Sequence, residues 1–171
     1  EVMAIGRNFE QALLKAVRGA EISQDSLNMK KMEPLTGEEL EQKILSQDDE
    51  RLFAVYESMK RGMTVERLHE LTGIDEWFLN KLLHLLTLER RMQGELFTEE
   101  LHMEAKQYGF PDRVIKEMTG LTELKHIPAC YRMVDTCSAE FAASTPYFYS
   151  SYGEEDEAGP FIMEHAVGKQ V

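Results

Sequence analysis

The sequence predicts an all-α protein, a helical bundle with two helix-turn-helix-like repeats and an extended aromatic C-terminal segment. Three observations lead to this prediction. The stretch 75–92, DEWFLNKLLHLLTLERRM, carries apolar residues on most sides at helical spacing, so it should lie in the middle of a bundle. One sequence pattern occurs twice at an offset of 47 residues. Helix-capping residues also precede most of the helical stretches.

The central predicted helix, 75–92, supplies the expected core. Trp77, Phe78, Leu82 and Leu86 recur at helical spacing and are predicted to anchor the bundle. Asp75 is the expected N-cap, because a short acceptor side chain can bind the open amides of the first turn.

The other elements follow in chain order. A short strand is expected at 2–5, then a helix at 9–18 that Asn8 caps and Gly19 ends. Residues 21–36 are polar and mixed, and they are expected to form a linker. Further helices are predicted at 37–47, 49–61, 65–71, 98–108 and 112–118, with a short one after Thr122. The expected caps of three of these helices are Thr36, Thr64 and Thr98.

The repeated pattern is a helix–turn–helix unit used twice. It reads GMTVERLHELTGIDEW at 62–77 and GFPDRVIKEMTGLTEL at 109–124. Thr64 and Pro111 occupy the same position at the start of a helix. Gly73 and Gly120 are expected to supply a left-handed turn between two helices, a conformation that glycine adopts without strain.

The chain changes character after Pro128. The stretches YRMVDTCSAEF at 131–141 and TPYFYSSY at 145–152 are rich in aromatic and β-branched residues, which predicts extended chain laid over a surface. The acidic run at 154–157 favours a solvated linker over a weak cation site. Residues 159–171 are expected to form a tail.

Composition and charge exclude several classes of function. Nineteen basic residues against 31 acidic ones give a net charge of −12, which repels nucleic acid and anionic membranes. No apolar run approaches the roughly 20 residues of a membrane span, and no signal peptide is expected. The two cysteines, Cys130 and Cys137, are too few for a disulfide framework, so a reduced, cytoplasmic protein is expected. No catalytic, cofactor or metal site is predicted, because no phosphate-binding glycine loop or metal-ligand spacing occurs.

The repeated unit leaves one alternative open, a helix-turn-helix module that binds nucleic acid or a regulatory partner. Asp75 and Glu76 argue against DNA binding, because they open the would-be recognition helix and would face phosphate. Packed helical hairpins are therefore favoured.

Three stretches resemble the large chain of carbamoyl-phosphate synthase. EVMAIGR at 1–7 with FEQALLKAVRG at 9–19 resembles the junction that leaves its first synthetase unit. IDEWFL at 74–79 resembles its central helical domain, and YRMVDTCSAEFAASTPYFYSSYGEEDEA at 131–158 is similar to the segment that closes this domain. The resemblance covers roughly residues 1–158. The final GPFIMEHAVGKQV departs from the family pattern.

The resemblance implies a division of the chain. Residues 1–20 would end the first synthetase unit and form an exit helix, and residues 21–36 would be a linker. Residues 37–158 would form the helical oligomerisation domain, and residues 159–171 a tail.

The resemblance also implies a role. The parent ligase makes carbamoyl phosphate from bicarbonate, two ATP and glutamine-derived ammonia, for arginine and pyrimidine synthesis. Its two ATP-grasp units use ATP with Mg or Mn, and a small glutaminase subunit supplies ammonia. Their ligands would lie outside this sequence, so no catalytic residue is transferred. This chain would be a non-catalytic domain that joins the two units and other large-chain copies, without nucleic acid or membrane as partners.

A joining domain should expose an apolar patch, and the predicted helix 49–61 offers one. Its candidate interface residues are Leu52, Phe53, Tyr56 and Met59, because these apolar side chains cannot all face one narrow core stripe. The alternative is that they pack within the chain on the helix 37–47.

Overall fold

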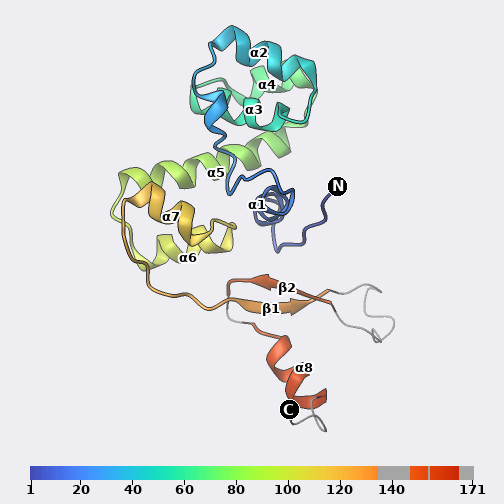
Figure 1. The fold of residues 1–171 in the computed structure, drawn as a ribbon, viewed down its shortest axis with the longest axis vertical. Helices are drawn as coiled ribbons and strands as arrows, with labels where there is room; N and C mark the ends of the chain where they lie inside the picture. Colours follow the sequence, from blue (N-terminus) through green and yellow to red (C-terminus); the bar gives the residue numbers. More distant parts are fainter. Residues whose placement is uncertain (135–146, 154, 166–171) are drawn as a thin grey trace.

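The computed structural model describes residues 1–134, 147–153 and 155–165. Over these ranges the chain is mostly helical, with one small two-stranded sheet near its C-terminus (Figure 1). This arrangement confirms the predicted all-α class. The helices are α1 (Phe9–Gly19), the 3-10 helix η1 (Lys30–Met32), α2 (Gly37–Ser46), α3 (Arg51–Lys60), α4 (Val65–Thr72), α5 (Glu76–Gly94), α6 (Glu99–Gln107), α7 (Asp112–Thr119) and α8 (Ala158–His165). The strands are β1 (Cys130–Met133) and β2 (Phe148–Ser151).

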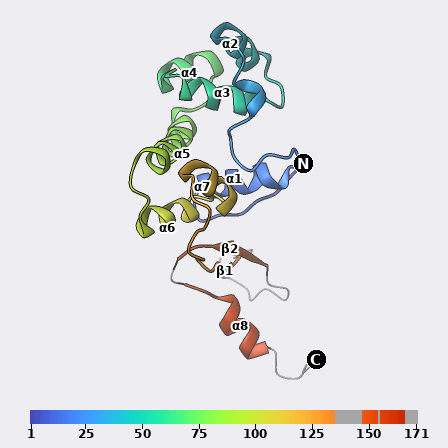
Figure 2. The same ribbon diagram turned by 60° about the vertical axis from the view of Figure 1, so that its left-hand side comes forward.

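Helix α5 is the centre of the bundle, as the sequence predicts. It contacts α1, α3, α4 and α7. Helices α2, α3 and α4 lie on one side of α5, and α1, α6 and α7 lie on the other side (Figures 1 and 2). The two groups therefore share α5 as a common wall. The buried residues of α5 are Leu79, Leu82, Leu85, Leu86, Leu88, Glu89 and Met92.

The predicted caps are present. Each N-cap side chain accepts a hydrogen bond from a backbone amide of the first helical turn. Thr36 forms a full capping box, in which Glu39 also accepts from the Thr36 amide at 2.7 Å. The other side-chain caps are Asn8, Thr64, Asp75 and Thr98.

The two copies of the repeat adopt the same turns. Gly73 and Gly120 end α4 and α7 with φ of 68° and 72°, in the left-handed region as predicted. Gly62 and Gly109 both have φ of 97° at the preceding turn. The backbone similarity therefore includes the glycine that opens each copy.

The segment 21–36 is more than a spacer. Leu27, Met29 and Met32 are buried in the main core cluster. Three carbonyl oxygens along it, those of Met32, Glu33 and Leu35, accept hydrogen bonds from Arg61. The segment therefore packs as part of the bundle.

The aromatic C-terminal segment forms an antiparallel hairpin of β1 and β2, with Cys130 opposite Ser151. Parts of the predicted extended stretch, residues 135–146, lie outside the described residues, as does Cys137. Helix α8 begins at Ala158, one residue before the expected tail, and contacts β1. Asp156 accepts from the Gly159 amide at 2.9 Å and so caps α8, whose Pro160 lies in the first turn, where proline is tolerated.

Two predicted local elements are absent from the described residues. Residues 2–5 form no strand, because a strand needs a partner and the two described strands pair with each other. No helix follows Thr122, where the chain runs irregularly to β1. A single isolated turn has too few hydrogen bonds to offset its conformational entropy.

The prediction that Trp77 and Phe78 are core anchors is wrong. Trp77 is 52% exposed and Phe78 is 43% exposed. Leu79 marks the buried face of α5, and Trp77, two residues earlier, lies more than half a turn away from it. The first turn of α5 therefore carries its aromatic rings on the surface, whereas the expected anchors Leu82 and Leu86 are buried.

The predicted exposure of the helix 49–61 is also wrong. Phe53, Tyr56 and Met59 are buried, and the half-buried Leu52 packs against the core cluster. Helix α3 contacts α2, η1 and α5, so it has neighbours on several sides. The intramolecular alternative therefore describes these residues.

Gly73→Ala and Gly120→Ala should each destabilise the protein by about 1–2 kcal/mol, the cost of a left-handed backbone with a Cβ. No atom lies within 4 Å of an added Cβ at either position, so the loss comes from the backbone alone. Gly94→Ala is the matched control, because its surroundings are equally open and its φ is not positive. Urea unfolding should show no loss for the control, and wild-type stability of Gly73→Ala would contradict the argument.

Candidate interaction surfaces

Three aromatic rings meet on the surface where α1 and α5 begin. Phe9 opens α1, and Trp77 and Phe78 lie in the first turn of α5. Their ring centroids are 5.6 Å apart for Phe9 and Trp77, 5.3 Å for Phe9 and Phe78, and 4.9 Å for Trp77 and Phe78, all edge-to-face. We call these three residues the aromatic patch.

A buried carboxylate fixes α1 against α5 beside the aromatic patch. Glu10 is fully buried, and its Oε1 lies 2.9 Å from Nδ1 of His84 and 3.4 Å from Nζ of Lys81. Lys81 Nζ also lies 5.2 Å from the centroid of the Trp77 ring. Lys81 thus contacts both the buried Glu10 carboxylate and the exposed Trp77 indole, and this contact holds the ring in place.

The second surface brings together segments far apart in sequence. Lys15 of α1 donates hydrogen bonds to the carbonyl oxygens of Ile5, at 2.9 Å, and of Ser150 in β2. Arg18, one turn further on, donates to the carbonyl oxygen of Gly109 at 2.8 Å. These two cations therefore join the N-terminal segment, the turn between α6 and α7, and the C-terminal hairpin.

A third cation completes this junction. The half-exposed Asp112 pairs with the buried Lys106, and the Lys106 ammonium lies 4.7 Å from the centroid of the Tyr152 ring. Burial, followed by repulsion from Arg18, lowers the pKa of Lys15, and burial lowers the pKa of Arg18. We call Lys15, Arg18 and Lys106 the basic junction. Carbonyl oxygens, the rings of Tyr149 and Tyr152 and the carboxylate of Asp112 surround it, as suits a structural tie.

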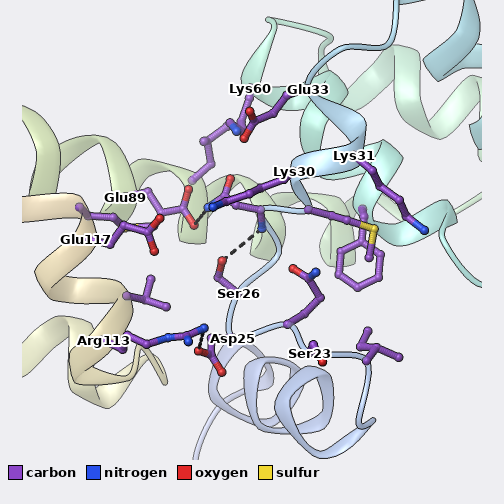
Figure 3. Close-up of a pocket in the computed structure, with 18 of the residues that line it drawn as sticks. Ser23, Asp25, Ser26, Lys30, Lys31, Glu33, Lys60, Glu89, Arg113 and Glu117 are labelled. Atoms are coloured by element: carbon purple, nitrogen blue, oxygen red, sulfur yellow. Dashed lines mark hydrogen bonds and ion pairs between the residues drawn. The ribbon is translucent and has the colours of Figure 1, made fainter.

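A cleft of about 1170 Å³ separates the segment 20–33 from α3, α5 and α7. Figure 3 shows acidic and basic side chains around the cleft, among them Arg113, which points at Asp25. Two ion pairs join charged residues that line this cleft, Arg113 with Asp25 and Lys31 with Glu50.

Glu89 is the most unusual group in this cleft. It is 4% exposed, and its Oε1 accepts a hydrogen bond from Asn28 Nδ2 at 2.9 Å. Burial raises the pKa of Glu89 above its ordinary value. Glu57, on α3, has the opposite balance. Burial by itself would raise the pKa of Glu57, but hydrogen bonds from Lys60 and Arg61 outweigh it, and the pKa is lowered.

Sequence reasoning missed all three surfaces in part. The aromatic patch contains two residues, Trp77 and Phe78, that the sequence predicts as core. Lys15 gives no signal, because its two acceptors are main-chain oxygens 10 and 135 residues away. For Glu89 a signal exists, since it lies among the leucines that form the buried face of α5.

Fold and surfaces together define a helical domain in which the N-terminal segment and the C-terminal hairpin meet at one junction. The chain belongs to the family described as the carbamoyl-phosphate synthetase large chain, oligomerisation domain, which it matches over residues 1–131. Within the described residues, no helix combines the length and apolar character needed to cross a membrane.

Proteins named carbamoyl phosphate synthase large chain are similar to nearly the whole chain. Those of Agathobacter rectalis and Thermoanaerobacter sp. are 44% and 42% identical, each over 92% of this chain. That of Thermomicrobium roseum is 43% identical over 98% of it. The chain spans only 15–16% of the length of these relatives. Neither the family nor the relatives favour the nucleic-acid alternative.

Glu89→Gln should stabilise the protein at neutral pH. A carboxyl whose pKa is raised on folding contributes most below its ordinary pKa of 4.5, and this contribution is lost as pH rises through the raised value. Glutamine removes the charge and keeps an acceptor for Asn28. Urea unfolding should therefore show an advantage at neutral pH that shrinks as the pH falls towards 4.5.

Glu57→Gln is the matched control with the opposite sign. Its lowered pKa means that the ionised form stabilises the fold, so the substitution should cost stability at neutral pH, and less in acid. The same pH dependence for both variants would contradict this assignment.

Lys15→Met should loosen the attachment of the hairpin. Hydrogen bonds from charged donors typically contribute about 1.5–3 kcal/mol, so the opening free energy of β1 and β2 should fall by about 1–3 kcal/mol. Hydrogen exchange should be faster at the amides of both strands and unchanged in α3. The exposed Lys30→Met is the control and should leave the hairpin unchanged. Unaltered exchange in Lys15→Met would show that other contacts hold the hairpin.

Proposed function

We propose that this chain acts as the non-catalytic oligomerisation and linking domain of a carbamoyl-phosphate synthase large chain. The observation that carries the proposal is the family match over residues 1–131, combined with a span of only 15–16% of the relatives' length. The remainder of such a large chain would hold the two ATP-grasp synthetase units. In this proposal the whole enzyme makes carbamoyl phosphate from bicarbonate, ATP and glutamine-derived ammonia.

Cofactors and further partners belong to the same proposal. ATP with Mg or Mn would bind the synthetase units, and a small glutaminase subunit would deliver ammonia. The pathways would be those of arginine and pyrimidine synthesis, and the location would be the cytoplasm. None of these roles is assigned to a residue of this chain.

The geometry supports a linking role through the basic junction. Lys15 Nζ contacts the carbonyl oxygens of residues 5 and 150, so one side chain joins the N-terminal segment to the C-terminal hairpin. Residues 1–7 resemble the end of the first synthetase unit, and residues 131–158 resemble the segment before the second. A domain with its two ends tied in this way would hold two attached units at a fixed separation.

Self-association tests the oligomerisation role directly. Sedimentation of this chain should show a concentration-dependent dimer or higher oligomer. The net charge of −12 opposes the approach of identical copies, so association should strengthen with salt. A monomer at all concentrations and salt levels, with intact helical circular dichroism, would contradict the proposal for this domain alone.

A further inference from the structure

A second pocket, of about 240 Å³, lies at the basic junction, where α1, the turn between α6 and α7 and the hairpin meet. All three cations of the junction line this pocket, and among the described residues that line it only Asp112 carries a carboxylate. The carbonyl oxygens that accept hydrogen bonds from Lys15 and Arg18 carry partial charges, which do not neutralise a full positive charge. In a chain with a net charge of −12, the pocket is therefore a local excess of positive charge.

Burial makes this excess charge costly. The Lys106 side chain is 8% exposed, and its counter-ion Asp112 is half-exposed. Burial lowers the pKa of Lys15 and of Arg18, and repulsion between these two cations lowers the pKa of Lys15 further. Asp25 acts on Arg18 in the opposite sense, but it does not line the pocket. Cations that are partly removed from water and lack a full counter-charge favour the binding of an anion.

Neutral hydrogen-bond donors border the same pocket. Gln11 lines it and is 1% exposed, and its Oε1 accepts a hydrogen bond from the Arg7 amide at 2.8 Å. None of the described residues accepts a hydrogen bond from Gln11 Nε2, so this buried donor lacks a partner. Helix α7 also begins at the pocket, with Pro111 as an N-cap that makes no side-chain cap bond. The open amides and the dipole of a helix N-terminus favour an anion as well.

We propose that the pocket at the basic junction binds a phosphate group. Three cations and one carboxylate leave two positive charges, and a phosphate group carries a charge of about −1.5 to −2 near neutral pH. The volume of about 240 Å³ lies below the roughly 300–1,000 Å³ of pockets for drug-sized ligands. The pocket therefore suits a free phosphate ion or the phosphate end of a small phosphomonoester. This inference does not depend on the proposed linking role.

Phosphate binding should stabilise the attachment of the hairpin. Ser150 and Tyr152 line the pocket together with residues of α1 and α7, so the site is complete only while the hairpin is in place. A ligand that binds only the closed arrangement shifts the equilibrium towards it. Lys15 also holds the Ile5 carbonyl, so the N-terminal segment should be stabilised as well.

Calorimetry and hydrogen exchange on the 171-residue chain test the site. Inorganic phosphate should bind saturably with one site per chain at constant ionic strength. At saturation, exchange should slow several-fold at the amides of β1 and β2 and stay unchanged in α3. Chloride and acetate at the same ionic strength should do neither. No saturable binding of phosphate, or equal slowing by chloride, overturns the proposal.

The source of the phosphate group is distinguished by a second ligand. Glycerol 3-phosphate carries the same group on a small ester. Tighter binding of the ester than of inorganic phosphate supports the site and assigns it to a phosphorylated small molecule. Tighter binding of inorganic phosphate supports the site and assigns it to the free ion.

Two variants of opposite sign separate binding from a loss of folding. Arg18→Gln should weaken phosphate binding by roughly 10-fold or more, the loss of one charge-assisted hydrogen bond. Asp112→Asn should tighten it several-fold, because it removes the carboxylate from the pocket, whereas a damaged fold would weaken it. Lys30→Gln is the control, since it removes the same charge as Arg18→Gln from an exposed position outside the pocket, and it should leave the affinity unchanged. Equal affinities in Arg18→Gln and Lys30→Gln, or weaker binding in Asp112→Asn, overturn the proposal.

Discussion

Burial of the leucine face of α5 is the constraint on which the rest of the described structure depends. Helices α4 and α7 have only eight residues each, too few to be stable alone in water, and both lie against α5. The two copies of the repeat therefore do not stack on each other as independent units. Each completes its apolar surface on the same central helix, which joins them into one bundle.

Two buried carboxylates give this apolar core its specificity. Glu10 reaches from α1 to His84 and Lys81 on α5, and Glu89 reaches from α5 to Asn28 in the segment 21–36. Leucines alone would tolerate sliding and rotation of neighbouring segments, whereas Oε1 of each carboxylate meets its partners in one arrangement only. Buried charge is costly in free energy, so the bundle sacrifices some stability for a defined arrangement.

The sequence predicts the parts of this fold that are decided locally. Helix caps and the glycine turns depend on hydrogen bonds and backbone angles within a few residues, and both are found where expected. Burial depends on which neighbours lie on each side of a helix, and periodicity does not give this information. Trp77 and Tyr56 show the two errors. Trp77, in the first turn of α5, was predicted to be buried and is exposed, whereas Tyr56, on α3, was predicted to be exposed and is buried. Lys15 was unpredictable for a related reason, since its acceptors are carbonyl groups that carry no residue signature.

The contact of one ammonium group with residues 5 and 150 has a mechanical consequence. Tension applied to the N-terminal segment reaches the C-terminal hairpin through Lys15, along a path a few ångströms long. The load does not have to travel through helices α2 to α7. The bundle can therefore deform, or lengthen a surface loop, while the spacing of the two segments stays the same. In this respect helices α2 to α7 lie outside the load path, and the Lys15 ammonium transmits force between the two segments.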